Sequence, residues 1–105
     1  MKFTVEFSEA AAEDLVQLFN FALRRELDSE TGDLDIADRA VQAIKDGMAF
    51  LKSSPFACRK AGNSPFVREL VIPFGSTGYV ALFEIVDSHT VIIGAIRHQR
   101  EDDYH

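Results

Sequence analysis

Hydrophobic and polar residues alternate with a period of two at the start of the chain. Phe3, Val5 and Phe7 are separated by polar residues, which is the pattern of a short strand with one buried face. Ser8 follows in a position suited to a helix N-cap, where a hydroxyl accepts a hydrogen bond from a free backbone N–H. The pattern therefore predicts a strand at residues 3–7 and a helix that begins next to Ser8.

Two amphipathic helices are predicted in the first half of the chain. Apolar residues recur at spacings of three and four at Ala11, Leu15, Leu18, Phe19, Ala22 and Leu23. This stripe predicts a helix of roughly 18 residues, and the polar residues 28–33 predict a turn after it. A second stripe is formed by Ile36, Ala40, Ile44, Met48 and Leu51. Asp35 is the predicted N-cap of this second helix and Pro55 is expected to stop it, so the pair predicts an antiparallel helical hairpin.

The second half of the chain is predicted to form three strands. Residues 66–72, 79–86 and 90–96 are rich in Val, Ile and Phe, and the short polar segments 75–78 and 87–89 predict antiparallel turns. The first strand is expected to join the same sheet, because an isolated strand cannot satisfy its backbone groups. The sequence thus predicts an α+β fold of order β-α-α-β-β-β, with the helical hairpin packed on a small, mostly antiparallel sheet.

The composition agrees with one soluble domain over residues 1–105. The chain is 47% hydrophobic and 27% charged, as in ordinary globular proteins. No apolar run approaches the ~20 residues of a membrane span, and the start of the chain lacks a secretory signal. A cytoplasmic protein without a membrane partner is expected. The single cysteine, Cys58, excludes an internal disulfide and a multi-cysteine zinc site, and no metal or cofactor is expected.

The charge argues against direct nucleic-acid binding. Seventeen acidic residues against eleven basic ones give a net charge of −6, whereas dedicated nucleic-acid binders usually carry a basic excess.

Several motifs, taken in order, resemble the RelE/ParE superfamily of toxins from bacterial type II toxin–antitoxin operons. They are Phe7-Ser8 with Ala11, Asp14 and Leu15, then Ser54-Pro55, then residues 67–70, 79–85 and 96–104. The similarity covers nearly the whole chain. The closing run from Arg97 to Tyr104 is most similar to the ParE side of the superfamily.

This resemblance implies a small toxin that a cognate antitoxin holds inactive. An extended antitoxin segment is expected to wrap the toxin and to add a strand to an edge of its sheet. ParE-type members poison DNA gyrase, whereas RelE-type members cleave messenger RNA on the ribosome, and one fold serves both. We expect a ParE-like, non-enzymatic toxin with DNA gyrase as its target. A folded but no longer toxic member of the family is another alternative.

The RNase alternative has its own candidate site. By resemblance, Arg68, Arg97, His98 and Tyr104 would supply the proton transfers and the cation that stabilises the charged phosphorane. The three acidic residues 101–103, which separate His98 from Tyr104, would repel a phosphate backbone.

The candidates for partner binding are Arg97, His98, Arg100 and Tyr104. A mixed-charge patch of this kind suits a protein surface better than a nucleic acid, although a solvated tail has the same composition. His98 is also consistent with a purely structural, hydrogen-bonded histidine.

Two other residues have competing interpretations. Arg68 next to Glu69 is consistent with a surface ion pair along a strand, which would contribute little to stability. The cations that follow Cys58 are of the kind that lowers the pKa of a thiol, but no motif indicates a nucleophile.

Overall fold

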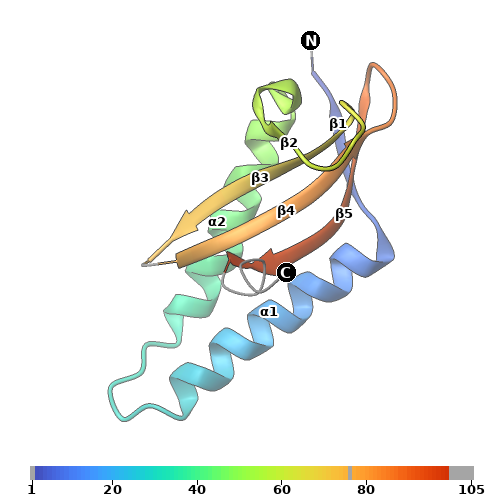
Figure 1. The fold of residues 1–105 in the computed structure, drawn as a ribbon. Coiled ribbons are helices and arrows are strands. Elements are labelled where there is room, and N and C mark those ends of the chain that lie inside the picture. Colours follow the sequence, from blue (N-terminus) through green and yellow to red (C-terminus); the bar gives the residue numbers. More distant parts are fainter. Residues whose placement is uncertain (1, 76, 100–105) are drawn as a thin grey trace.

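A computed structural model describes residues 2–75 and 77–99 of the chain. In chain order the elements are β1 (Thr4–Phe7), α1 (Glu9–Leu27), α2 (Asp35–Leu51), the 3₁₀ turn η1 (Pro55–Ala57), β2 (Arg59–Lys60), β3 (Val67–Phe74), β4 (Thr77–Ile85) and β5 (Thr90–His98). Figure 1 shows the two helices joined by a loop that extends past the end of the sheet. The predicted α+β architecture, a helical hairpin on a mostly antiparallel sheet, is confirmed.

The sheet has the strand order β1-β5-β4-β3-β2. The three long strands pair antiparallel, as expected for a meander. The first strand joins the same sheet, as predicted, and it lies parallel to β5 in a register that runs from Thr4 opposite Thr90 to Phe7 opposite Ile93. Parallel pairing requires a long crossover, which the helical hairpin and the intervening strands provide.

The short strand β2 was not expected from the sequence. Arg59 and Lys60 pair with Glu69 and Arg68 of β3. Two residues are too few to show an alternating pattern, so this strand is defined only by its tertiary pairing.

The hydrophobic core lies between the helices and one face of the sheet. The stripe predicted for the second helix supplies Ile44 and Leu51, and the sheet supplies Phe83, Ile93 and Ile96; all five side chains are almost completely buried. Burying each such side chain contributes about 1.5–3 kcal/mol. The helices are therefore held on the sheet by the apolar stripes that predicted them.

The predicted cap at the start of α1 is confirmed, and it also fastens the helix to β5. The Ser8 hydroxyl accepts a hydrogen bond from the Ala11 N–H at 3.1 Å and donates one to the Gly94 carbonyl at 3.3 Å. Further along α1, the Asp14 carboxylate accepts a hydrogen bond from the Ile96 N–H at 3.0 Å. Because β1 pairs with β5 only as far as Ile93, these side chains satisfy groups on the edge of β5 that β1 leaves uncovered.

Replacing Asp14 by alanine is expected to lower the free energy of unfolding by about 1–3 kcal/mol, because the partly buried Ile96 N–H loses its acceptor. Asparagine keeps an acceptor oxygen and should restore part of the loss. Urea denaturation measures the difference, with Glu13→Ala, an exposed neighbour on the same helix, as the control. Equal stability of the Asp14→Ala and Glu13→Ala proteins would show that this bond is unimportant.

The start of α2 differs from the prediction by one residue. The helix is preceded by Leu34, which makes no side-chain cap bond. The capping carboxylate belongs to Asp33, which accepts a hydrogen bond from the Asp35 N–H at 2.9 Å. Asp side chains often bond the backbone two residues on. The predicted N-cap, Asp35, is instead the first residue of the helix.

The connection between β3 and β4 is tighter than predicted. Phe74 pairs with Thr77, so Thr77 and Gly78 belong to β4 rather than to the turn. Gly75 has a φ of 62°, which a residue without a Cβ adopts at little cost. Gly78 is buried against the opposite strand, where an added Cβ would lie 2.2 Å from the Ile72 carbonyl oxygen.

Candidate functional site

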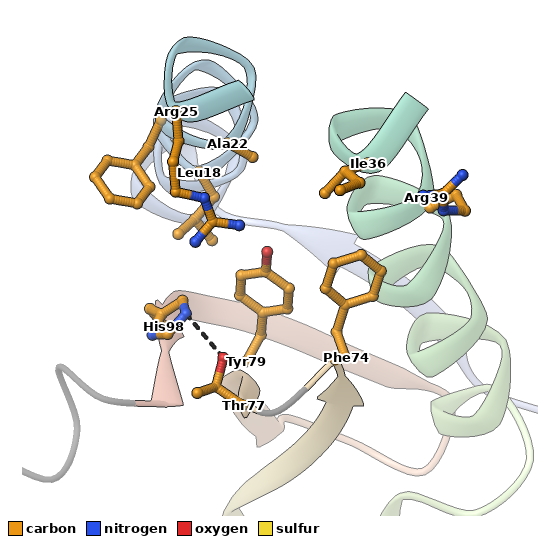
Figure 2. A pocket seen from close by; sticks show the side chains of 11 residues that line it. Leu18, Ala22, Arg25, Ile36, Arg39, Phe74, Thr77, Tyr79 and His98 are labelled. Carbon is orange, nitrogen blue, oxygen red and sulfur yellow. Dashed lines mark hydrogen bonds between the residues drawn. The ribbon is translucent and has the colours of Figure 1, made fainter. Parts of the chain in front are cut away.

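A cavity of about 450 Å³ opens between the helical hairpin and the end of the sheet. We call it the hairpin pocket. It is lined by Leu18, Phe21, Ala22 and Arg25 of α1, Ile36 and Arg39 of α2, and Phe74, Gly75, Thr77, Tyr79 and His98 of the sheet and its turn. Figure 2 shows Tyr79 and Phe74 standing side by side and pointing from the sheet toward the space between the helices.

Three polar side chains lie next to each other on the floor of the hairpin pocket. His98 Nε2 and Thr77 Oγ1 are 3.2 Å apart and share a hydrogen bond, drawn as the dashed line in Figure 2. The His98 ring also packs edge-on against Tyr79, with 5.7 Å between the ring centroids. This position follows from the sheet register, in which His98 is opposite Tyr79 on the neighbouring strand.

Tyr79 combines a buried ring with a hydroxyl directed into the hairpin pocket. Only 6% of the residue is exposed, and burial raises the pKa of its hydroxyl, an effect that the nearby Arg25 guanidinium partly opposes. Tyr79 is therefore a neutral hydrogen-bond donor at physiological pH.

The two arginines of the hairpin pocket differ in their partners. Arg39 donates a hydrogen bond to Asp33 at 3.0 Å, and this bond lowers the pKa of the Asp33 carboxyl, with help from the Asp35 N–H. The Arg25 guanidinium points toward Tyr79 in Figure 2, and its Nε lies 3.5 Å from Glu26. Both arginines thus have an acidic partner, and Arg25 is the one whose charge acts on Tyr79.

The structure places the predicted site residues at three different locations. His98 lies in the hairpin pocket. Arg97, the residue before it, is opposite Val80 and shares the sheet face that points away from the helices, since successive strand residues alternate. Arg100 and Tyr104 lie outside the described residues.

Arg68 lies toward the opposite end of the sheet from His98. The partners of these two residues on β4 are Phe83 and Tyr79, four residues apart, which corresponds to about 13 Å along the strand. The structure therefore does not bring Arg68 and His98 into one site.

The guanidinium of Arg68 is engaged by backbone carbonyls. It donates hydrogen bonds to the carbonyls of Pro65 at 2.8 Å, Phe56 at 3.0 Å and Cys58 at 2.7 Å. It also lies over the Phe56 ring, 5.2 Å from the centroid, which is cation–π geometry. Arg68 thus fastens the η1 turn and the loop before β3 to each other.

The structure decides between the competing interpretations of Arg68 and Cys58. Arg68 does not pair with Glu69, because adjacent strand residues face opposite sides of the sheet; Glu69 instead pairs with Arg59. The pKa of Cys58 is raised rather than lowered, because burial outweighs the opposing charge of Arg68.

A second cavity, of about 460 Å³, lies near Arg68 at the far end of the sheet. It is lined by Phe3, Phe56, Phe66, Ile85, Val86, Asp87 and Ser88. Phe56 packs edge-on against both Phe3 and Phe66, and about half of the Phe56 and Phe66 side chains is exposed.

Within residues 2–75 and 77–99, no group of three or more His, Cys, Asp or Glu side chains is placed to hold a metal ion. No described helix is long and apolar enough to cross a membrane.

Of the polar side chains that line the hairpin pocket, only His98 was a predicted site residue. The sequence did not indicate Arg25, Arg39, Thr77 and Tyr79, which come from three different elements. Their sequence positions share no motif spacing, so only the packing of the hairpin on the sheet brings them together.

Comparison with known proteins supports the resemblance found in the sequence. A solved structure described as the chromosomal ParDE toxin–antitoxin system from P. aeruginosa contains a similar chain, with a TM-score of 0.69 and 18% sequence identity over 92% of this chain and 96% of that one. No curated protein matched the sequence. Residues 5–103 match the profile of a family described as the ParE toxin of the type II toxin–antitoxin system parDE. Because this match spans nearly the whole sequence, the chain belongs to the family of ParE toxins of type II toxin–antitoxin systems.

Proposed function

We propose that this toxin inhibits DNA gyrase by binding to it, and that a cognate antitoxin of the ParD type neutralises the toxin. The observation that carries the proposal is the family match over residues 5–103. The P. aeruginosa structure, described as a ParDE system, supports a paired antitoxin.

The positions of the basic residues favour binding over RNA cleavage. An RNase site needs a cation close to its acid and base, but Arg68 lies about 13 Å along the sheet from His98 and its guanidinium holds backbone carbonyls. The net charge of −6 also disfavours association with a polyanion.

The sheet face turned away from the helices is the proposed surface for gyrase. On this face Val71, the buried Val80 and Arg97 form one cross-strand row, and Glu69, Leu82 and Ala95 form the next. Leu82 is 38% exposed and Arg97 is exposed. A surface that combines exposed apolar side chains with charged ones suits a protein partner, and Arg is enriched at such interfaces.

The edge of β3 offers a place for an antitoxin strand. β2 pairs with only two residues of β3. The Val67 carbonyl accepts a hydrogen bond from Ala61 on the β2 side, whereas the Phe66 carbonyl faces β4. Backbone groups alternate between the two sides of a strand, so those of Val71 and Pro73 point to the same side as those of Val67, away from β4. The two residues of β2 do not extend along this part of the edge. A strand edge of this kind accepts an added strand. Pro73 is tolerated at this edge because it has no backbone N–H that would need a partner in the ladder.

A gyrase supercoiling assay with purified protein tests the proposal. We expect inhibition with trapped, cleaved DNA, reversed when the antitoxin is added. If gyrase is unaffected at micromolar toxin while ribosome-bound transcripts are cleaved, and His98→Phe abolishes this cleavage, the RNase alternative is correct instead. If neither activity is present, the chain is a folded but non-toxic member of the family.

Replacing Arg97 by alanine is expected to weaken gyrase inhibition several-fold without changing the fold, because the side chain is exposed. Inhibition curves and circular dichroism spectra check both parts. Arg24→Ala is the matched control, since Arg24 is an exposed arginine on α1. Equal inhibition by the two variants would exclude Arg97 from the gyrase surface.

A further inference from the structure

Among the described residues, the lining of the hairpin pocket presents hydrogen-bond donors and no acidic side chain. The chain contains seventeen acidic residues, yet none of the eleven residues that line the pocket is acidic. The polar side chains that line it are those of Arg25, Arg39, Thr77, Tyr79 and His98. Each of them carries or can carry a donor hydrogen. A pocket of this composition in an acidic protein is suited to a negatively charged group.

Two of these donors are directed at the same space from opposite layers. The Tyr79 hydroxyl points up from the sheet and the Arg25 guanidinium points down from α1 (Figure 2). Among the residues that the structure describes, no hydrogen bond involves the Tyr79 hydroxyl, and no buried side-chain oxygen or nitrogen lacks a partner. The Tyr79 hydroxyl is therefore open to the pocket, although its ring is buried. An acceptor placed between Tyr79 and Arg25 would give the Tyr79 hydroxyl a partner in place of solvent, and would give the Arg25 guanidinium a second partner beside Glu26.

The remaining lining of the hairpin pocket is apolar and aromatic. It consists of Leu18, Phe21, Ala22, Ile36 and Phe74. The Phe74 ring lies 6.1 Å from that of Tyr79, and Phe21 is largely exposed at the rim. The volume of about 450 Å³ is within the range of small-molecule sites, which combine apolar walls with a few convergent polar groups.

We propose that the hairpin pocket binds a small organic anion, in which one phosphate or carboxylate group is attached to an apolar body such as an aromatic ring. The anionic group lies between the Arg25 guanidinium and the Tyr79 hydroxyl. The apolar body packs against Phe74 and the facing side chains of the two helices. This binding site is independent of the proposed action on gyrase, because it lies on the helix side of the sheet.

The test is a titration of the full-length chain followed by NMR amide shifts. The probes are phenyl phosphate, benzyl alcohol as a neutral analogue and inorganic phosphate as an anion without an apolar body. We expect saturable shifts confined to pocket residues such as Thr77, Tyr79 and Ala22, with phenyl phosphate at least fivefold tighter than either control probe. Equal binding of benzyl alcohol would show an apolar cavity without anion selectivity, and absence of saturable shifts would exclude a site; either result overturns the proposal.

Neighbouring arginines provide the matched variants. Arg25 lines the pocket, whereas Arg24 is adjacent on the same helix and does not line it. Arg25→Ala is expected to weaken phenyl phosphate binding about tenfold, and Arg24→Ala to leave it unchanged. Tyr79→Phe should weaken binding of phenyl phosphate but not of benzyl alcohol. Equal losses in the Arg24→Ala and Arg25→Ala proteins would show non-specific attraction and overturn the proposal.

An anionic group next to an apolar body is found both in free small molecules and in a bound protein, where an acidic side chain has apolar neighbours. An acetylated Leu-Glu-Leu tripeptide with an amidated end distinguishes the two sources. Tighter binding of phenyl phosphate than of the tripeptide supports a free small molecule. Tighter binding of the tripeptide at the same residues would overturn that assignment in favour of a protein side chain.

Discussion

Replacing Gly78 by alanine is expected to lower the free energy of unfolding by about 3 kcal/mol, as typical for forced overpacking of a tightly packed site. The added Cβ would lie 2.2 Å from the Ile72 carbonyl oxygen and 3.1 Å from the Pro73 Cα. Both contacts are with backbone, which cannot turn aside as a side chain can. The hairpin of β3 and β4 would have to shift, and the neighbouring core residue Tyr79 would shift with it.

Gly94 provides the matched control for this substitution. It is also a strand glycine without a positive φ, but the nearest atom to its added Cβ is the Leu82 carbonyl oxygen at 3.8 Å, an ordinary contact distance. Gly94→Ala should therefore change the free energy of unfolding by no more than about 0.5 kcal/mol. Urea denaturation of both proteins gives the comparison. A Gly78→Ala protein as stable as the Gly94→Ala protein would mean that the β3–β4 hairpin is not packed this closely.

Replacing Arg68 by alanine is expected to cost about 2–4 kcal/mol, because several charge-assisted hydrogen bonds are lost together. The carbonyls of Pro65, Phe56 and Cys58 would lose their donor. The Phe56 ring would also lose the guanidinium that lies over it. Lysine cannot reproduce the planar arrangement of donors, so Arg68→Lys should recover only part of the stability.

Arg59→Ala is the control for the loss of an arginine at this end of the sheet. Arg59 pairs with Glu69 at the surface, where 59% of its side chain is exposed, and such pairs contribute about 0–1 kcal/mol. Thermal or urea unfolding should separate the two variants clearly. Equal stability would contradict the fastening role, and loss of RNA cleavage by a fully stable Arg68→Ala protein would favour the RNase alternative.

The family and the architecture could be predicted from the sequence because their signals are local. Ser8 caps α1 as expected, and the apolar stripe that contains Ile44 and Leu51 lies in the core. Apolar residues that recur every 3.6 positions in a helix or every 2 positions in a strand indicate the buried face, and they do so regardless of which neighbouring element covers that face. The same reasoning failed at Asp35 and at Thr77, where the end of an element depends on one hydrogen bond or one pairing.

The candidate site was predicted less completely than the fold. His98 was selected because it lies in a closing run that resembles the family, and the structure does place it in the hairpin pocket. Arg68 was selected on the same grounds, but its donors are used by backbone carbonyls. Resemblance identifies the position of a residue in the chain, whereas its hydrogen-bond partners depend on segments that the resemblance does not describe.

The sequence by itself determined the two helices, the four longer strands, their order and the faces that they bury, because these depend on residues a few positions apart. The tertiary structure decided which distant groups meet. The bond from Ile96 to Asp14 spans 82 residues of sequence, and the hairpin pocket joins Arg25 of α1 to Tyr79 of β4 and His98 of β5. Such contacts form only when the helical hairpin packs on the sheet, since no local pattern encodes which side chain will face which across two layers.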